Sequence, residues 1–218
     1  IYLMVYCWMT SMMILSGMSR YYFDPKIERL SMCSTVFTFL LGTGCVAILV
    51  VAGMLDMFPA FREHWYIIMI ATLHQSILQL YLFSLEKLKL DRNSGKYLLF
   101  SLLKSVIYLG VFWLLVVVWQ RSLSSMYEAH LISSGCILCL LFLYDRDLRC
   151  IRIKINRTIL GTLLAFSAPL ILAGIGMYII EFSSRFFIKY YIGDEALGNF
   201  SFAYKIVSAL TVLLLAPA

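Results

Sequence analysis

Three ionisable residues recur at four-residue spacing near the carboxyl end of the chain, and their types suit the binding of an anion. Glu181, Arg185 and Lys189 would share one face of a helix, and glutamate four residues before arginine is the favourable order for an ion pair. The planar guanidinium of arginine matches phosphate through two parallel hydrogen bonds. The same spacing is also typical of an ion pair at the end of a membrane helix, and the residues alone leave both interpretations open.

Polar side chains also interrupt the apolar run Trp65–Leu85. His74 lies near its middle, and Gln75 and Gln79 extend the polar stripe. Such a stripe avoids lipid, so it either forms a hydrogen bond between helices or lines a cavity. A second histidine, His130, lies at the end of a later run, where we expect the membrane interface.

Two lysines lie inside apolar runs. Lys104 is about seven residues, roughly 10 Å, into its run, from where its side chain can reach back to the lipid headgroups. Lys205 lies in the last run, where it either completes an anion site with Arg185 or reaches outward.

No enzyme motif accompanies these residues. The sequence lacks H-E-x-x-H, G-x-S-x-G, a phosphate-binding glycine loop and an Asp-rich metal motif. Five of the six cysteines lie within apolar runs, where free cysteine packs as a small hydrophobe. We therefore expect no catalysis, no metal and no cofactor.

The composition is that of a membrane protein. Hydrophobic residues make up 62% of the chain, charged residues 14%, and the mean hydropathy is +0.88. These values exclude a soluble globular domain. The net charge of +6 does not indicate nucleic-acid binding, because the cations are concentrated in the gaps between apolar runs.

Seven apolar runs must position the polar residues, and most are long enough to cross about 30 Å of hydrocarbon as a helix. They are Ile1–Met18, Ser31–Leu55, Trp65–Leu85, Tyr97–Trp119, Ala129–Tyr144, Ile159–Ile180 and Phe200–Ala218. The sequence therefore predicts an all-α, polytopic transmembrane bundle of about seven spans. The fifth run is short unless it extends back into residues 122–128.

The lysines and arginines fall in every second gap between these runs. In order, the six gaps contain 3, 1, 4, 1, 5 and 2 of them. Cytoplasmic loops carry the excess of Lys and Arg. The alternation thus predicts that the first, third and fifth gaps face the cytoplasm.

The sixth run contains helix-weakening residues. Pro169 removes a backbone hydrogen bond, and Gly174 and Gly176 follow within two turns. We expect this helix to bend near Pro169 and to line a cavity.

Several segments together resemble one family of transporters. They are Ser167-Ala168-Pro169-Leu170, Ser184-Arg185-Phe186-Phe187-Ile188, Gly193, Ala196-Leu197-Gly198-Asn199-Phe200 and Ala203-Tyr204-Lys205-Ile206. They resemble the polysaccharide flippases, the O-antigen and capsule-type translocases of the multidrug/oligosaccharidyl-lipid/polysaccharide exporter superfamily. One departure is Ser184, which stands where that family usually has an acidic residue before the arginine; Glu181 lies one turn earlier.

The resemblance implies two helix bundles that alternate access to a central cavity. Residues 1–158 would supply five helices of the amino-terminal bundle and residues 159–218 two helices that begin the carboxyl-terminal one. The chain begins and ends inside apolar runs, so we expect a fragment of a 12–14-helix transporter in the inner (cytoplasmic) membrane.

The cargo implied by the resemblance is an oligosaccharide linked to polyprenyl pyrophosphate, with H⁺ or Na⁺ as a possible coupling ion. The expected substrate-binding residues are Arg185, Lys205, Glu181, Tyr204 and His74. Two alternatives remain open: a cation-coupled multidrug exporter of the same superfamily, and a membrane-embedded polysaccharide polymerase or acyltransferase.

Overall fold

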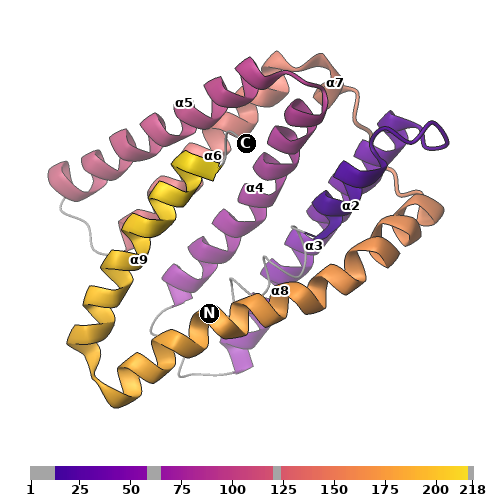
Figure 1. Ribbon diagram of the computed structural model, residues 1–218. Coiled ribbons are helices and arrows are strands. Elements are labelled where there is room, and N and C mark those ends of the chain that lie inside the picture. Colours follow the sequence, from indigo (N-terminus) through magenta and orange to yellow (C-terminus); the bar gives the residue numbers. More distant parts are fainter. Residues whose placement is uncertain (1–12, 58–64, 120–123, 216–218) are drawn as a thin grey trace. The chain divides into compact units, whose positions relative to one another are not determined.

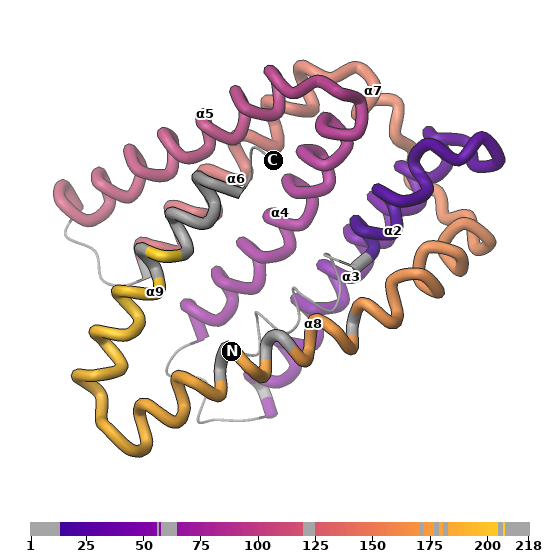
Figure 2. Tube along the Cα trace, viewed as in Figure 1, coloured from indigo at the N-terminus to yellow at the C-terminus, as the bar shows by residue number. Residues whose placement is uncertain are grey.

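The structure is a computed structural model that describes residues 13–57, 65–119 and 124–215 (Figure 2). Every regular element within these ranges is a helix (Figure 1). The helices are α2 (Met13–Tyr21), α3 (Arg29–Met57), α4 (Trp65–Leu90), α5 (Ser94–Trp113), α6 (Ser124–Tyr144), α7 (Arg146–Arg149), α8 (Arg157–Tyr191) and α9 (Asp194–Leu215). A short π-helix, η3 (Leu114–Val118), continues α5. The predicted all-α fold is confirmed.

Five of the described helical segments are long and apolar enough to cross a membrane. They are Arg29–Leu55, Trp65–Leu90, Ser94–Val118, Ser125–Tyr144 and Arg157–Gly176. The chain is thus a multi-pass membrane protein, as predicted. The first predicted span falls mostly on residues 1–12, outside the described residues, and the last one ends in residues 216–218, which also lie outside them.

The fifth predicted span is longer than its apolar run. The helix α6 begins at Ser124, so it takes in the preceding polar residues and reaches 21 residues. That length gives about 31 Å of rise, enough to cross the hydrocarbon layer.

The chain forms two compact units, Ile1–Ile171 and Leu172–Ala218, and each is described by itself. The predicted division of the transporter into bundles at residues 158 and 159 refers to the arrangement of the whole protein, and it stays a prediction.

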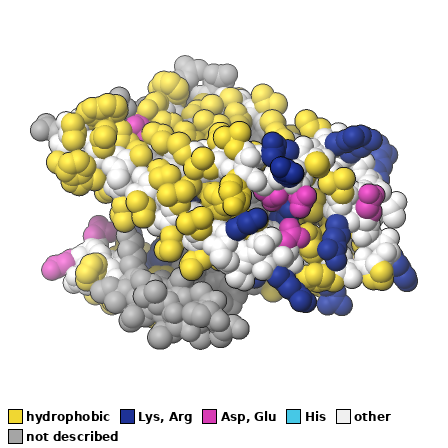
Figure 3. Space-filling model, turned by 90° about the horizontal axis from the view of Figure 1, so that it is seen from above, with side chains coloured by type: hydrophobic (Ala, Val, Ile, Leu, Met, Phe, Trp, Pro, Cys, Tyr) yellow, Lys and Arg dark blue, Asp and Glu magenta, His cyan; other side chains and the backbone are white. Residues whose placement is uncertain are grey.

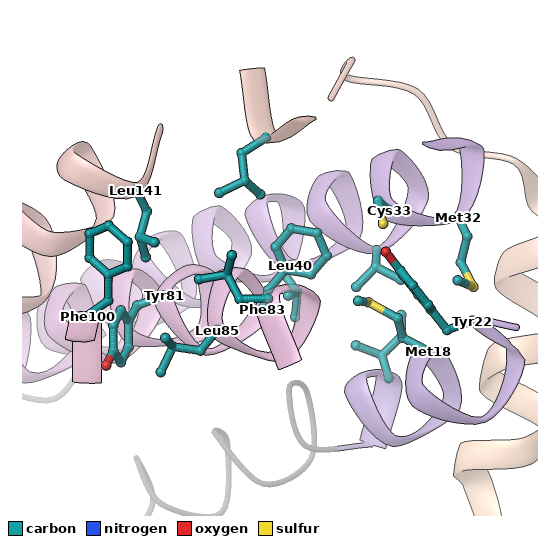
Figure 4. Packing of buried hydrophobic residues seen from close by; sticks show 14 of the residues in the cluster. Met18, Tyr22, Met32, Cys33, Leu40, Tyr81, Phe83, Leu85, Phe100 and Leu141 are labelled. Atoms are coloured by element: carbon teal, nitrogen blue, oxygen red, sulfur yellow. The ribbon is translucent and has the colours of Figure 1, made fainter. Parts of the chain in front are cut away.

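In the first unit, α4 packs between α3 and α6, and α5 packs on α6 (Figure 1). Leu40, Tyr81, Phe83 and Leu141 belong to one buried cluster that joins α3, α4 and α6 (Figure 4). Because lipid is as apolar as these side chains, close packing rather than exclusion of water holds such helices together.

Small residues let the helices of this unit approach closely. A Cβ atom placed on Gly44 of α3 would lie 3.1 Å from the Cβ of Ser76 on α4. A Cβ atom on Gly17 of α2 would lie 3.1 Å from the carbonyl oxygen of Leu163 on α8. Glycine at these two positions allows the backbones to meet where a larger residue would hold them apart.

The three cation-rich gaps meet at one end of the first unit. The Tyr22 hydroxyl, in the first gap, lies 2.5 Å from Oδ1 of Asp91 in the third. The Lys87 ammonium, also in the third gap, lies 3.3 Å from Oδ2 of Asp145 in the fifth. Burial and the hydrogen bond to Asp91 raise the pKa of the Tyr22 hydroxyl, so this phenol stays protonated as a donor.

A further polar contact lies at the opposite ends of α4 and α6, beside the cation-poor second and fourth gaps. Tyr66, next to the second gap, lies 3.0 Å from Glu128 in the fourth, measured between the hydroxyl and Oε1. Viewed as in Figure 3, the lysines and arginines gather toward one end of an otherwise largely hydrophobic face. Among the described residues of the first unit, the contacts of the first, third and fifth gaps therefore lie at one end and the contact beside the second and fourth gaps lies at the other, as the charge alternation predicts for these five gaps.

The orientation of these ends is open to a labelling experiment. With the native cysteines replaced, single cysteines at Arg62 and Arg121 are expected to react with an impermeant thiol reagent added to intact cells. Cysteines at Lys26, Lys89 and Arg152 are expected to react only after the membrane is permeabilised, because the excess of cations holds their loops in the cytoplasm. Strong labelling at position 89 or 152 in intact cells would contradict this orientation.

Candidate functional site

Three aromatic rings from three helices stack within the first unit. His74 of α4 lies against His130 of α6, with 5.2 Å between ring centroids and an interplanar angle of 28°. His130 in turn lies against Tyr108 of α5, at 3.9 Å and 13°. Instead of standing alone at the membrane interface, His130 joins the predicted site residue His74 to a third helix.

The imidazole of His74 is poorly satisfied by the protein. Its residue is 9% exposed, and the buried Nε2 atom has no hydrogen-bond partner. A buried polar atom left unpaired costs about 1–3 kcal/mol, so this atom is a candidate partner for a water or for a polar group of a ligand. The sequence left open whether the polar stripe of α4 forms a hydrogen bond between helices. In the structure, the Nε2 atom of His74 forms no such hydrogen bond.

Lys104 also contacts α4. Its Nζ atom lies 4.3 Å from the ring centroid of Tyr81, a cation–π contact, and the predicted reach of this side chain to the headgroups stays a prediction. Gln79, one turn beyond His74 along α4, is fully buried. The first unit therefore holds imidazole, amide, phenol and ammonium groups inside helices that are otherwise apolar.

The second unit brings together two of the predicted substrate-binding residues. The guanidinium carbon of Arg185, on α8, lies 5.2 Å from the ring centroid of Tyr204, on α9. Lys189, one turn further along α8, pairs instead with Asp194 at the start of α9, at 3.3 Å between Nζ and Oδ1. The side chains of Glu181 and Lys205 lie outside the described residues, so their predicted roles stay predictions.

A glycine at the corner between α8 and α9 allows this pairing. Gly193 has φ +111, a conformation that other residues rarely adopt, and its N–H donates to the carbonyl of Ile188 at 3.1 Å. This turn ends α8 at Tyr191 and lets α9 begin at Asp194, so that the two helices can place Arg185 against Tyr204.

The helix-weakening residues of α8 lie inside a continuous helix. Pro169, Gly174 and Gly176 all fall within Arg157–Tyr191. The bend predicted near Pro169, and the cavity that it would line, stay predictions.

A buried ion cluster escaped the sequence analysis. The Lys87 side chain, only 6% exposed, lies 3.0 Å from Asp91 Oδ2, 3.3 Å from Asp145 Oδ2 and 3.6 Å from Asp147 Oδ2. Asp145 also accepts the backbone N–H of Asp147 at 3.0 Å and so caps α7. One local signal was the four-residue spacing of Lys87 and Asp91, but no local pattern connects these two residues with Asp145.

The sequence of the chain was compared with models of known protein families, and one family matches. The model of the polysaccharide biosynthesis protein family matches residues 2–217. The chain belongs to this family. No curated protein and no solved structure matches the chain.

Membership of the polysaccharide biosynthesis protein family agrees with the exporter superfamily that the sequence resembles, and it assigns the chain a role in making or exporting polysaccharide. The side chains described above in each unit are of types that can contact sugars. Sugars offer hydroxyl groups to imidazole and amide side chains, and their apolar faces can lie on aromatic rings such as Tyr108 and Tyr204. An arginine beside an aromatic ring adds a partner for an anionic group.

Proposed function

We propose that this chain is part of a flippase, which moves a lipid-linked oligosaccharide of surface-polysaccharide synthesis across the inner membrane by alternating access. The observation that carries the proposal is the contact between Arg185 and Tyr204, in a multi-pass membrane protein of the polysaccharide biosynthesis family. The cargo class would be a sugar chain on polyprenyl pyrophosphate.

An arginine held against an aromatic ring suits the chemistry of flipping. The pyrophosphate must pass a hydrocarbon layer in which an unpaired charge costs several kcal/mol, so a cation at the path lowers the barrier. An aromatic ring stacks on the flat face of a guanidinium, whereas the N–H groups that donate hydrogen bonds to phosphate point outward in the guanidinium plane. Tyr204 can thus hold Arg185 in place while the in-plane N–H groups of the guanidinium bind the anion.

The polar stack of the first unit suits the sugar part of the cargo. His74 offers its buried Nε2, and the rings of His130 and Tyr108 hold the imidazole in place. The proposed step makes and breaks no covalent bond, so the protein acts as a transporter and not as an enzyme. A proton or sodium gradient would supply the energy.

Cells that lack their own flippase test the proposal. Expression of the full-length protein is expected to restore surface polysaccharide and to remove the lipid-linked oligosaccharide that accumulates at the cytoplasmic face. Both quantities can be measured by surface labelling and by mass spectrometry of extracted lipids. Restored drug resistance with unchanged lipid-linked oligosaccharide would contradict the proposal and favour a drug exporter.

A further inference from the structure

A cavity of about 870 Å³ opens at the cation-rich end of the first unit, and none of the three stacked aromatic rings lines it. We call it the basic pocket, because four cations and one carboxylate line it. They are Arg149, Arg152, Lys154, Arg157 and Glu28. The lining comes from two places in the chain, the start of α3 and the connection that leads from α7 into α8.

In the part of the chain that the structure describes, the four cations of the basic pocket outnumber the one carboxylate that lines it, Glu28. Among the described residues, none of its four cations forms an ion pair with a carboxylate. The nearby Asp145 and Asp147, on either side of Arg146, are instead paired with Lys87. Acidic and basic side chains of the same connection are thus separated, and the cations face the cavity.

The wall of the basic pocket is held in place by backbone hydrogen bonds. The N–H of Arg152 donates to Oγ of Ser34 at 3.3 Å, and the N–H of Asn156 donates to Oγ1 of Thr35 at 3.2 Å. Asn156 also accepts the N–H of Thr158 at 3.1 Å and so caps α8, whose positive dipole end faces the same region. A wall fixed in this way loses little conformational entropy when it binds an anion.

Apolar residues alternate with the cations along the same connection. Residues 151–156 are not helical, and Ile153 and Ile155 are 76% and 50% exposed. Leu30, another lining residue, is 44% exposed. Exposed isoleucines that alternate with Arg152 and Lys154 suit the boundary between headgroups and acyl chains, where the apolar side chains meet lipid and the cations meet phosphate.

The position of the basic pocket along the helices also suits the boundary between lipid headgroups and acyl chains. Two membrane-crossing segments begin at its edge, one at Arg29 and one at Arg157. From the cavity, its excess of cations, the fixed wall and the exposed isoleucines, we propose that the basic pocket binds the phosphate of a membrane lipid headgroup. This site does not depend on the proposed function, because it concerns a lipid at the membrane surface and not the transport path.

Native mass spectrometry of the full-length protein in mild detergent tests the site with three lipids. They are phosphatidylglycerol, phosphatidylcholine with the same acyl chains, and undecaprenyl pyrophosphate. We expect the wild-type protein to retain phosphatidylglycerol in preference to phosphatidylcholine. The variant Arg149→Gln/Arg152→Gln/Arg157→Gln is expected to lose about 100-fold in affinity for phosphatidylglycerol, since each cation near a headgroup contributes about five-fold.

A matched variant removes three cations from the same end of the protein but outside the basic pocket: Lys26→Gln/Lys89→Gln/Arg92→Gln. We expect it to change lipid affinity by less than about three-fold. The single variant Arg152→Gln, expected to lose about five-fold, keeps the test valid if the triple pocket variant does not fold.

The lipids distinguish two sources of the phosphate. Loss of phosphatidylglycerol binding in the pocket variants supports a resident membrane lipid. If the pocket variants lose only the binding of undecaprenyl pyrophosphate, the phosphate site is supported, and its occupant is the cargo lipid and not a resident membrane lipid. Equal losses in the pocket and matched variants, or no loss in the pocket variants for any lipid, would overturn the proposal.

Discussion

Replacing Lys87 by methionine is expected to lower the free energy of unfolding by about 3 kcal/mol. The ammonium is buried between Asp91 and Asp145, whose side chains are 22% and 15% exposed. Without it, two mostly buried carboxylates lose their counter-ion, and removing one partner of a buried pair is much more costly than removing both. Asp147, at 76% exposure, adds little. Thermal unfolding of the purified protein measures the change, with an expected fall of about 5–10 °C.

Lys89→Met is the matched control for this experiment. Lys89 lies two residues away on the same helix, but its side chain is 64% exposed, and its one ion pair with a described residue is with Glu86, at 3.6 Å. We expect it to leave the unfolding temperature nearly unchanged. Adding Asp145→Asn to Lys87→Met should recover part of the loss, because fewer unpaired charges remain. Equal stability of Lys87→Met and Lys89→Met would show that the cluster does not hold the loops together.

Replacing Arg185 by glutamine is expected to reduce transport by about 30-fold or more, at unchanged membrane levels. The reason is the loss of charge-assisted hydrogen bonds to the cargo, worth about 2 kcal/mol. Arg185→Lys should recover only part of the activity, because an ammonium cannot form two parallel hydrogen bonds to phosphate. It also stacks less well on Tyr204. The measurement is surface polysaccharide in a flippase-deficient strain, with each variant quantified in the membrane.

Lys189→Gln separates a specific role from a general loss of positive charge. Lys189 lies one turn from Arg185 on α8, but it is exposed and pairs with Asp194. We expect this variant to support near wild-type transport. Full complementation by Arg185→Gln at normal levels would mean that Arg185 only anchors the helix at the interface.

The membrane spans could be predicted, and so could the gaps that lie at the same end of the bundle, because both predictions depend on local sequence. Hydropathy identifies each apolar run, and the cation content of a gap needs no knowledge of its neighbours. The packing then brought Tyr22 to Asp91 and Lys87 to Asp145, at the end predicted for the cation-rich gaps.

The buried polar groups could be predicted only one at a time. His74 was recognisable as a polar residue in an apolar run, but its contact with His130 and Tyr108 depends on which faces of α4, α5 and α6 meet. Tyr108 in particular looks like any aromatic residue of a membrane helix. The Lys104 contact with Tyr81 was missed for the same reason, because snorkelling and cation–π stacking leave the same sequence pattern.

The candidate pair in the second unit was easier to predict. Arg185 and Tyr204 both belong to the stretch that resembles the flippases, and Gly193 between them marks the turn that joins their helices. The basic pocket was not predicted, because its four arginines and lysines already had a sufficient explanation as residues that orient the chain. Only the structure shows that they surround a cavity with the start of α3.

Two polar contacts near the ends of α4, one to Glu128 of α6 and one to Asp145 directly after α6, have a consequence for the choice of membrane. Tyr66 and Glu128 meet near one end, and Lys87 and Asp145 meet at the other. Their separations of 21 residues on α4 and 17 along α6 correspond to about 31 and 26 Å of helical rise. These contacts fix the height of the apolar band between them near the average hydrocarbon thickness. A thicker bilayer would impose a hydrophobic mismatch that tilting one helix alone cannot relieve, since both helices are fastened at both ends.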